Sequence, residues 1–148
     1  MKPVLFLRAA SVLTLIHAVL HTIGGVFGKP DPGVQAMVAA TMRTRFPFLG
    51  TTRSYSDFYL GMGLAVSIFL TVEAIAFWIL ASMSKSDAAR LRPLLGIFVV
   101  GYLAMAVNSY AFFFAAPVIV EIVIAACLVM AIYTASSTSE DSTAAEPR

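Results

Sequence analysis

Six side chains that carry acid–base or hydrogen-bonding chemistry interrupt otherwise apolar stretches of this sequence: His17, His21, Asp57, Glu73, Asn108 and Glu121. A charged group in an apolar medium is costly, so each of these residues requires a partner or a functional reason. A histidine beside a carboxylate can bind a polar group, relay a proton or act as an acid–base pair. The residue types therefore predict a polar site within apolar surroundings.

The spacing of these residues indicates the direction in which they point, if the stretches are helical. His17 and His21 are four residues apart and so share one helix face with Gly24. Asn108 is in line with Ala104 and Ala111, and Glu121 with Ala125. Small residues mark the surfaces on which membrane helices approach one another, so we expect these polar groups to point toward neighbouring helices.

Four apolar stretches have the length that a membrane-spanning helix requires, about 20 residues. They cover residues 3–27, 57–83, 94–113 and 117–135. Backbone groups have no water partner in lipid, so stretches of this length are expected to be helical. We therefore predict an all-α fold, an integral membrane four-helix bundle. The first stretch is expected to be a retained helix, because it is too long for a signal peptide and has no convincing cleavage site.

The composition supports a single membrane domain. Of the 148 residues, 59% are hydrophobic and 12% are charged, the latter about half the share found in soluble proteins. A soluble domain of this length could not bury so much apolar surface. The net charge of +2 is too small to indicate binding to nucleic acid. Cys127 is the single cysteine, so no intrachain disulfide can form.

The connections between the stretches differ in character. In the long loop 28–56, five residues at helical spacing predict a short helix along the membrane surface: Val34, Met37, Val38, Thr41 and Met42. The connection 84–93 is polar, and a tight uncharged turn is expected at Ala115-Ala116-Pro117. The segment 136–148 is small and polar, and we expect a disordered tail.

The basic residues near the helix ends predict the orientation. With the N-terminus inside, five cations lie on the cytoplasmic side, namely Lys2, Arg8, Lys85, Arg90 and Arg92. Four lie outside, namely Lys29, Arg43, Arg45 and Arg53. We therefore expect both termini in the cytoplasm, with the bacterial inner membrane as the location. The outer arginines would bind lipid phosphates or cover the polar site as a lid.

Depth along the helices sorts the polar residues into levels. At about 1.5 Å per residue, His21, Asn108 and Glu121 lie about 6–9 Å from the outer ends, and His17 about 15 Å. The sequence therefore predicts an interior cluster of His17, His21, Asn108 and Glu121 that opens toward the outer face. Tyr59 and Tyr110 are expected at its rim.

The two carboxylates of the second stretch require separate explanations, because they lie about 160° apart around the helix axis. Asp57 follows Ser54 with the spacing of a capping box, so we expect it to cap the helix, with a place at the mouth of the site as the alternative. Glu73 is about 24 Å deep. It has no predicted partner in the chain, and it is a candidate proton site or contact with another protein.

Several kinds of site are not indicated. The two histidines share one helix face, so one chain cannot supply both axial ligands of a haem. His17, His21 and Glu121 would form a two-histidine, one-carboxylate metal set, but spacing alone is a weak indication. No nucleotide-binding glycine loop, nucleophile elbow or Cys-x-x-Cys motif occurs. We predict neither a metal nor a cofactor.

Two stretches carry a resemblance to known proteins: His17-Ala-Val-Leu-His-Thr-Ile-Gly-Gly25 and Arg53-Ser-Tyr-Ser-Asp-Phe-Tyr-Leu-Gly-Met-Gly63. They look like stretches of small bacterial four-helix membrane proteins of unknown function. The layout is more distantly similar to the DoxX-like group and to the sterol-isomerase-like four-helix membrane proteins. Members of the latter group bury acidic and histidine residues around a hydrophobic ligand. The resemblance implies a comparable pocket here and transfers no catalytic role.

Three functions are compatible with these features. The favoured one is a binding protein whose bundle encloses a small apolar molecule, such as a lipid or a quinone, with few polar contacts. The second is a membrane enzyme that uses His17 or His21 with Glu121 as an acid–base pair on a lipid-like substrate. The third is a structural subunit that meets another membrane protein, or a second copy of itself, through Glu73 and an outer aromatic surface. In the third case the polar residues would do no more than hold the helices in register.

Overall fold

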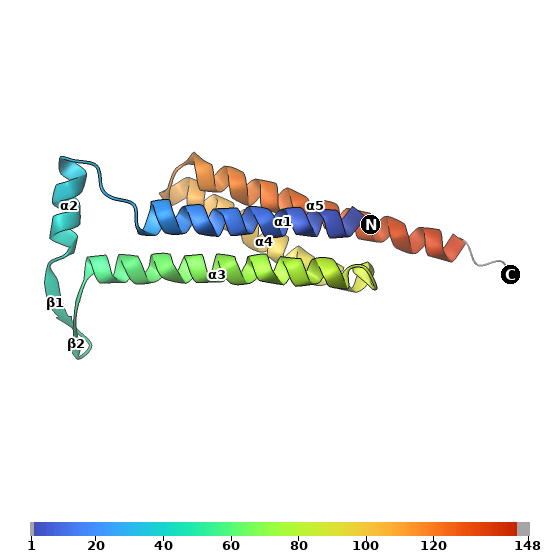
Figure 1. Cartoon of the computed structure of the whole chain (residues 1–148), viewed down its shortest axis with the longest axis horizontal. Coiled ribbons are helices and arrows are strands. Elements are labelled where there is room, and N and C mark those ends of the chain that lie inside the picture. The colour runs from blue at the N-terminus through green and yellow to red at the C-terminus, as the bar shows by residue number, and fades with distance from the viewer. Residues whose placement is uncertain (1, 145–148) are drawn as a thin grey trace. The chain divides into compact units, whose positions relative to one another are not determined.

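A computed structural model describes residues 2–144, with side chains from residue 3 to residue 135. Its elements are α1 (Lys2–Leu20), the π-helix η1 (His21–Val26), α2 (Val34–Met42), β1 (Arg45–Phe48), β2 (Thr51–Ser54), α3 (Tyr55–Met83), α4 (Ala88–Phe112) and α5 (Ala115–Ala144) (Figure 1). The chain divides into two compact units. Unit 1 comprises Met1–His17 and Thr71–Arg148, and unit 2 comprises Ala18–Leu70.

Four helices are long and apolar enough to cross a membrane, as predicted. The spans are Pro3–Val26, Tyr55–Met83, Ala88–Phe112 and Ala115–Ala135. The predicted all-α class is also confirmed, since the only strands form one small hairpin among the described residues. Each span buries only a minority of its residues inside the protein. Helices of this kind present most of their surface to lipid, so they indicate an integral membrane protein.

Two of the predicted connections between helices differ from those in the structure. α4 begins at Ala88 rather than at residue 94 and contains Pro93, which was expected to precede the helix. Asp87 makes the earlier start possible, because its side chain accepts a hydrogen bond from the Arg90 backbone N–H over 3.3 Å. The turn between α4 and α5 lies at residues 113–114, whereas Ala115, Ala116 and Pro117 form the first turn of α5. Proline is tolerated there because first-turn N–H groups have no helical partner.

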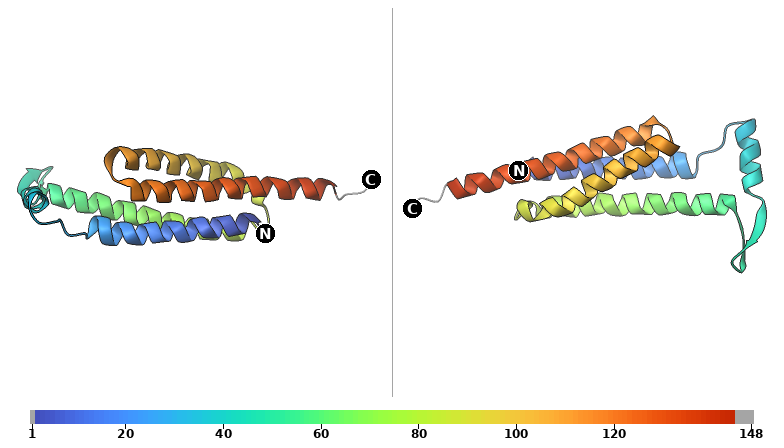
Figure 2. Two further views of the ribbon diagram at one scale, coloured as in Figure 1. Left: turned by 90° about the horizontal axis from the view of Figure 1, so that it is seen from above. Right: turned by 180° about the vertical axis from the view of Figure 1, so that it is seen from behind.

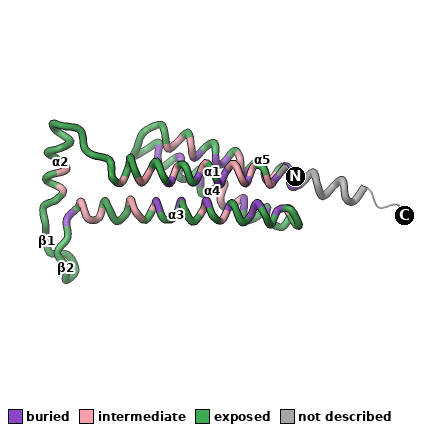
Figure 3. The backbone as a smooth tube through the Cα atoms, in the orientation of Figure 1, coloured by how far each residue is buried: buried purple, intermediate pink, exposed green. Residues whose placement is uncertain are grey.

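Unit 1 has a core drawn from four helical segments. Buried residues recur at intervals of three or four along each segment, which gives every helix one inward stripe. The core comprises Leu7, Ala10, Phe77, Leu80, Ala81, Leu91, Leu95, Tyr102, Ile124, Ala125, Leu128 and Ala131. The ring of Phe77 packs edge-on against Phe98, with centroids 4.9 Å apart. α4 and α5 pack against each other as a hairpin (Figure 2), and Figure 3 shows their buried positions as purple stripes.

Unit 2 holds the predicted short helix and a hairpin that was not predicted. α2 coincides with the expected surface helix and buries none of its residues. β1 and β2 pair antiparallel with Phe48 opposite Thr51. Leu49 and Gly50 form the two-residue turn, both with positive φ, as right-twisted hairpins require. The hairpin leads directly into α3.

The start of α3 is held by the predicted capping box. The Ser54 backbone N–H donates to Asp57 Oδ2 over 2.8 Å, and the Asp57 N–H donates to Ser54 Oγ over 3.2 Å. These reciprocal bonds satisfy backbone donors that have no partner within the helix. The helix-cap role predicted for Asp57 is therefore confirmed.

The disorder predicted for the polar tail, residues 136–148, stays a prediction. The backbone of α5 is helical as far as Ala144. The side chains from residue 136 onward and all of residues 145–148 lie outside the described part of the chain.

Candidate functional site

Tyr102 lies at the centre of a hydrogen-bonded chain inside unit 1. Its hydroxyl donates to Glu73 Oε2 over 2.8 Å and lies 3.1 Å from Thr14 Oγ1. A tyrosine has one hydroxyl proton, so Thr14 donates to the tyrosine oxygen. Thr14 is fully buried and Tyr102 is 4% exposed. These bonds connect α1, α4 and α3 through side chains within the apolar core.

Ser109 and Glu121 form a second buried contact, between α4 and α5. The Ser109 hydroxyl donates to Glu121 Oε1 over 2.9 Å. Glu121 is only 2% exposed. Its other oxygen, Oε2, is buried and has no hydrogen-bond partner among the described residues. A buried acceptor left in this state typically costs about 1–3 kcal/mol.

The two contacts belong to one polar region. Tyr102 and Ser109 are seven residues apart on α4 and hence on the same helix face. The Glu121 carboxyl also lies close enough to the Tyr102 hydroxyl for a Coulomb interaction. Tyr102 is thus hydrogen-bonded to Glu73, whereas Glu121 acts on it through its charge alone. In an apolar interior such an arrangement can hold a proton or accept a donor group from a ligand.

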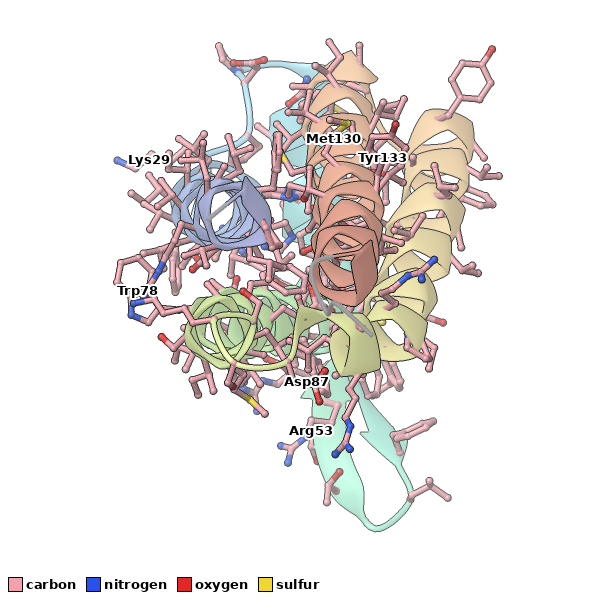
Figure 4. The ribbon with its side chains drawn as sticks, turned by 90° about the vertical axis from the view of Figure 1, so that its right-hand side faces the viewer. Lys29, Arg53, Trp78, Asp87, Met130 and Tyr133 are labelled. Atoms are coloured by element: carbon pink, nitrogen blue, oxygen red, sulfur yellow. The ribbon has the colours of Figure 1, made fainter. Side chains whose placement is uncertain are left out.

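Arg8 is fixed near one end of the α1 span. Its guanidinium lies 3.3 Å from the centroid of the Trp78 ring, and Nη2 donates to Ser82 Oγ over 3.1 Å. Figure 4 shows Trp78 on the outer side of α3. The arrangement is a cation–π contact and needs no carboxylate. Arg8 therefore has a structural partner in unit 1 and no contact with the two glutamates.

The two histidines have separate surroundings. His17 is half-buried and lies one turn beyond Thr14. In unit 2, His21 Nδ1 lies 3.1 Å from the Ser67 hydroxyl, and Thr22 Oγ1 lies 2.8 Å from the same hydroxyl. His21 also begins η1, where the Phe27 N–H bonds to the Thr22 carbonyl in the i→i−5 pattern. The regular 100° spacing therefore does not hold beyond His21.

Asn108 requires a correction. We predicted that it faces the bundle interior beside Glu121, but its side chain is exposed. The buried polar residue of α4 is its neighbour Ser109, and that residue makes the contact with Glu121. The predicted rim residues Tyr59 and Tyr110 are both exposed. That His17 and His21 join Glu121 in one ligand site stays a prediction.

Sequence reasoning missed Tyr102 and Ser109 and found no partner for Glu73. One signal was available, because Leu95, Tyr102, Ala106 and Ser109 repeat at helical intervals and form the buried stripe of α4. A tyrosine within an apolar stretch also requires a hydrogen-bond partner when it is buried. Instead, Asn108 was predicted to face the interior, because alanines lie in line with it on the same helix. The two stripes differ by one residue, which is about 100° around the helix.

Comparisons with protein-family models, with curated proteins and with solved structures found no match. The likeness to DoxX-like and sterol-isomerase-like proteins therefore stays a prediction. Within neither unit do three or more described His, Cys, Asp or Glu side chains gather in a way that could hold a metal ion.

Proposed function

We propose that this integral membrane protein binds a small apolar molecule that carries a hydrogen-bond donor, such as a hydroxyl group. Glu121 is the residue that would receive the donor, and Ser109 would orient the carboxyl. The proposal rests on one observation, the buried Glu121 Oε2 that lacks a partner among the described residues. A donor on a ligand would satisfy this oxygen and offset the cost of its burial.

Glu121 is preferred to Glu73 as the binding group because of their different surroundings. Glu73 accepts a hydrogen bond from Tyr102 and is only partly buried. Glu121 is almost fully buried, and half of its carboxyl is unsatisfied. The helices around it offer an apolar setting, in which a few polar contacts fix the orientation of a lipid-like ligand.

We further propose the bacterial cytoplasmic membrane as the location, with both termini in the cytoplasm. Four spans return the chain to the side on which it began. Lys85 lies in the connection between α3 and α4, and Arg90 and Arg92 lie in the first turns of α4. Lys2 and Arg8 lie near the N-terminal end of α1. Cations close to span ends favour the cytoplasmic side.

The test replaces Glu121 by glutamine. Glutamine has nearly the same shape, and its amide oxygen can accept the Ser109 proton. At the position of Oε2, however, it presents a donor in place of an acceptor. Native mass spectrometry of gently purified protein, with extraction of bound organic molecules, measures the co-purifying ligand. We expect the wild type to retain such a molecule and Glu121→Gln to lose it.

The matched control is Glu73→Gln, which changes a carboxyl that already has a donor. This variant should keep the molecule. Full retention by Glu121→Gln contradicts the proposed role of Glu121. A wild-type protein that is free of any bound molecule, even after incubation with membrane lipid extract, contradicts ligand binding itself and favours a structural role for the polar contacts.

A further inference from the structure

The segment from Lys29 to Tyr55 in unit 2 combines exposed apolar side chains with unpaired positive charge. Along α2, Val34, Met37 and Val38 are all exposed, and Leu49 at the tip of the hairpin is 90% exposed. The segment joins the end of one span, at Val26, to the start of the next, at Tyr55. The two ends of the segment therefore lie close to lipid headgroups if both helices cross the membrane.

A groove with a volume of about 290 Å³ runs along α2 beside the start of α3, and its lining residues are Val34, Met37, Val38, Thr41, Met42 and Tyr55. Its one aliphatic hydroxyl, that of Thr41, donates to the Met37 carbonyl over 3.0 Å and so is already satisfied. The walls are otherwise hydrocarbon and aromatic. Such a groove suits an alkyl chain better than a polar group.

The segment that contains this groove is rich in positive charge. Between Lys29 and Ser54 there are four cations against one carboxylate, a net charge of +3. Within the described part of the chain, the one salt bridge joins Asp87 to Arg90 at the start of α4, so none of these cations is in an ion pair. Arg43 directly follows Met42 of the groove, and Arg45 is in β1 of the hairpin. Arg53 is in β2 of the hairpin (Figure 4).

The nearby carboxylates are engaged elsewhere. Asp31 bonds to the Gln35 side chain, and Asp57 is held in the capping box with Ser54. Asp57 lies within Coulomb range of Arg45 and Arg53 without forming an ion pair with either. The guanidinium groups of the segment therefore remain available to a phosphate.

The backbone that carries Arg45 and Arg53 is held in place by the packing of the hairpin on α3. Phe46 packs against Tyr55 with ring centroids 5.0 Å apart, and Phe48 packs against Phe58 at 5.1 Å. These contacts hold the hairpin at the first turns of α3. A cation held at a fixed level binds a lipid phosphate with less loss of entropy than one on a disordered loop.

We propose that this segment is a binding site for an anionic phospholipid, with an acyl chain in the α2 groove and the phosphate on Arg43, Arg45 and Arg53. The inference is independent of the proposed function, because it uses residues of unit 2 alone. The occupant follows from the charge complementarity and from the position of the segment at the ends of two spans.

The test is native mass spectrometry of the full chain in mixed micelles with equal amounts of phosphatidylglycerol and phosphatidylcholine. The wild type should retain phosphatidylglycerol in preference. The variant Arg43→Gln/Arg45→Gln/Arg53→Gln should lose this preference by about tenfold or more, because each cation near an anionic lipid contributes about a fivefold change. The matched control, Lys85→Gln/Arg90→Gln/Arg92→Gln, loses the same charge from the α3–α4 connection and the first turns of α4, and it should keep the preference.

Further variants and competitors separate the parts of the proposal. Met37→Gln/Val38→Gln should weaken binding of both lipids, and unchanged binding would contradict the role of the groove.

Displacement of the lipid by inorganic phosphate would indicate a free-anion site instead. Equal losses in the two charge variants, or a bound polypeptide or second copy in place of lipid, would overturn the proposal. Glu121→Gln should leave the preference intact, which separates this test from that of the proposed function.

Discussion

At the scale of single residues, Tyr102 connects more of unit 1 than any residue that was predicted from the sequence. Its hydroxyl joins Thr14 on α1 to Glu73 on α3, and its ring lies 6.1 Å from that of Phe77. Polar contacts between membrane helices are individually modest. Tyr102 combines two of them with aromatic packing, so it should contribute measurably to stability.

We expect Tyr102→Phe to lower the free energy of unfolding by about 0.5–2 kcal/mol, because it removes the donor to Glu73 and the acceptor for Thr14 while keeping the ring. The measurement is thermal unfolding in mild detergent, followed by helical circular dichroism. Tyr110→Phe is the control, since Tyr110 is 83% exposed on the same helix. Equal unfolding temperatures for the two variants would show that the buried chain adds nothing to stability.

The sequence predicted that polar residues form the candidate site, but it did not predict correctly on which side of the helix each side chain lies. Glu121 was predicted to be interior, and it is buried. Asn108 was predicted to face the interior because small residues lie in line with it on the same helix, and Ser109 was not considered. The choice between adjacent residues depends on helix rotation. That rotation is set by the packing of Leu91, Leu95 and Tyr102 against neighbouring helices, which spacing alone does not reveal.

At the scale of elements, the long helices and α2 were predictable and the hairpin was not. A spanning helix is specified by a long apolar stretch, and α2 by apolar residues at helical spacing. The hairpin strands have only four residues each. Pro47 lies within β1, and proline argues against a strand. Leu49 adopts a positive φ that residues other than glycine rarely take, so the turn was also not apparent.

Within unit 2, Gly63 marks a close approach between α3 and η1. A Cβ atom at this position would lie 3.0 Å from Val26 Cγ2, whereas one at Gly61 would meet nothing within 4 Å. The two glycines occur in one short stretch of α3, so their replacement changes helix propensity equally. The difference between them isolates the contact with Val26.

We therefore expect Gly63→Leu to lower the free energy of unfolding by about 1–3 kcal/mol, through a clash with Val26. Gly61→Leu should leave stability unchanged or raise it by less than about 1 kcal/mol, through better helix propensity. Thermal unfolding of both variants in the same detergent gives the comparison. If Gly63→Leu is as stable as Gly61→Leu, the close approach of α3 and η1 is not a packing constraint.

At the scale of the whole molecule, the number of spans determines the relation between loops. Four spans imply that the hairpin around Leu49 and the connection around Ser86 lie on opposite sides of the membrane. This conclusion is independent of which side is cytoplasmic. The orientation itself depends on a difference of five cations against four near the span ends. If the outer arginines bind anionic lipid, as proposed above, lipid binding explains why these cations lie on the outer side against the positive-inside preference.

The topology can be tested with single cysteines, because the chain contains only Cys127. In a Cys127→Ser background, we expect Leu49→Cys to react with a membrane-impermeant maleimide added outside intact cells. Ser86→Cys should react only after the membrane is permeabilised. The reverse pattern would keep the four spans and invert the orientation, which would contradict the proposed cytoplasmic termini. Reaction of both cysteines from one side would contradict the crossing of the membrane by α3, since both positions are exposed and only this span lies between them.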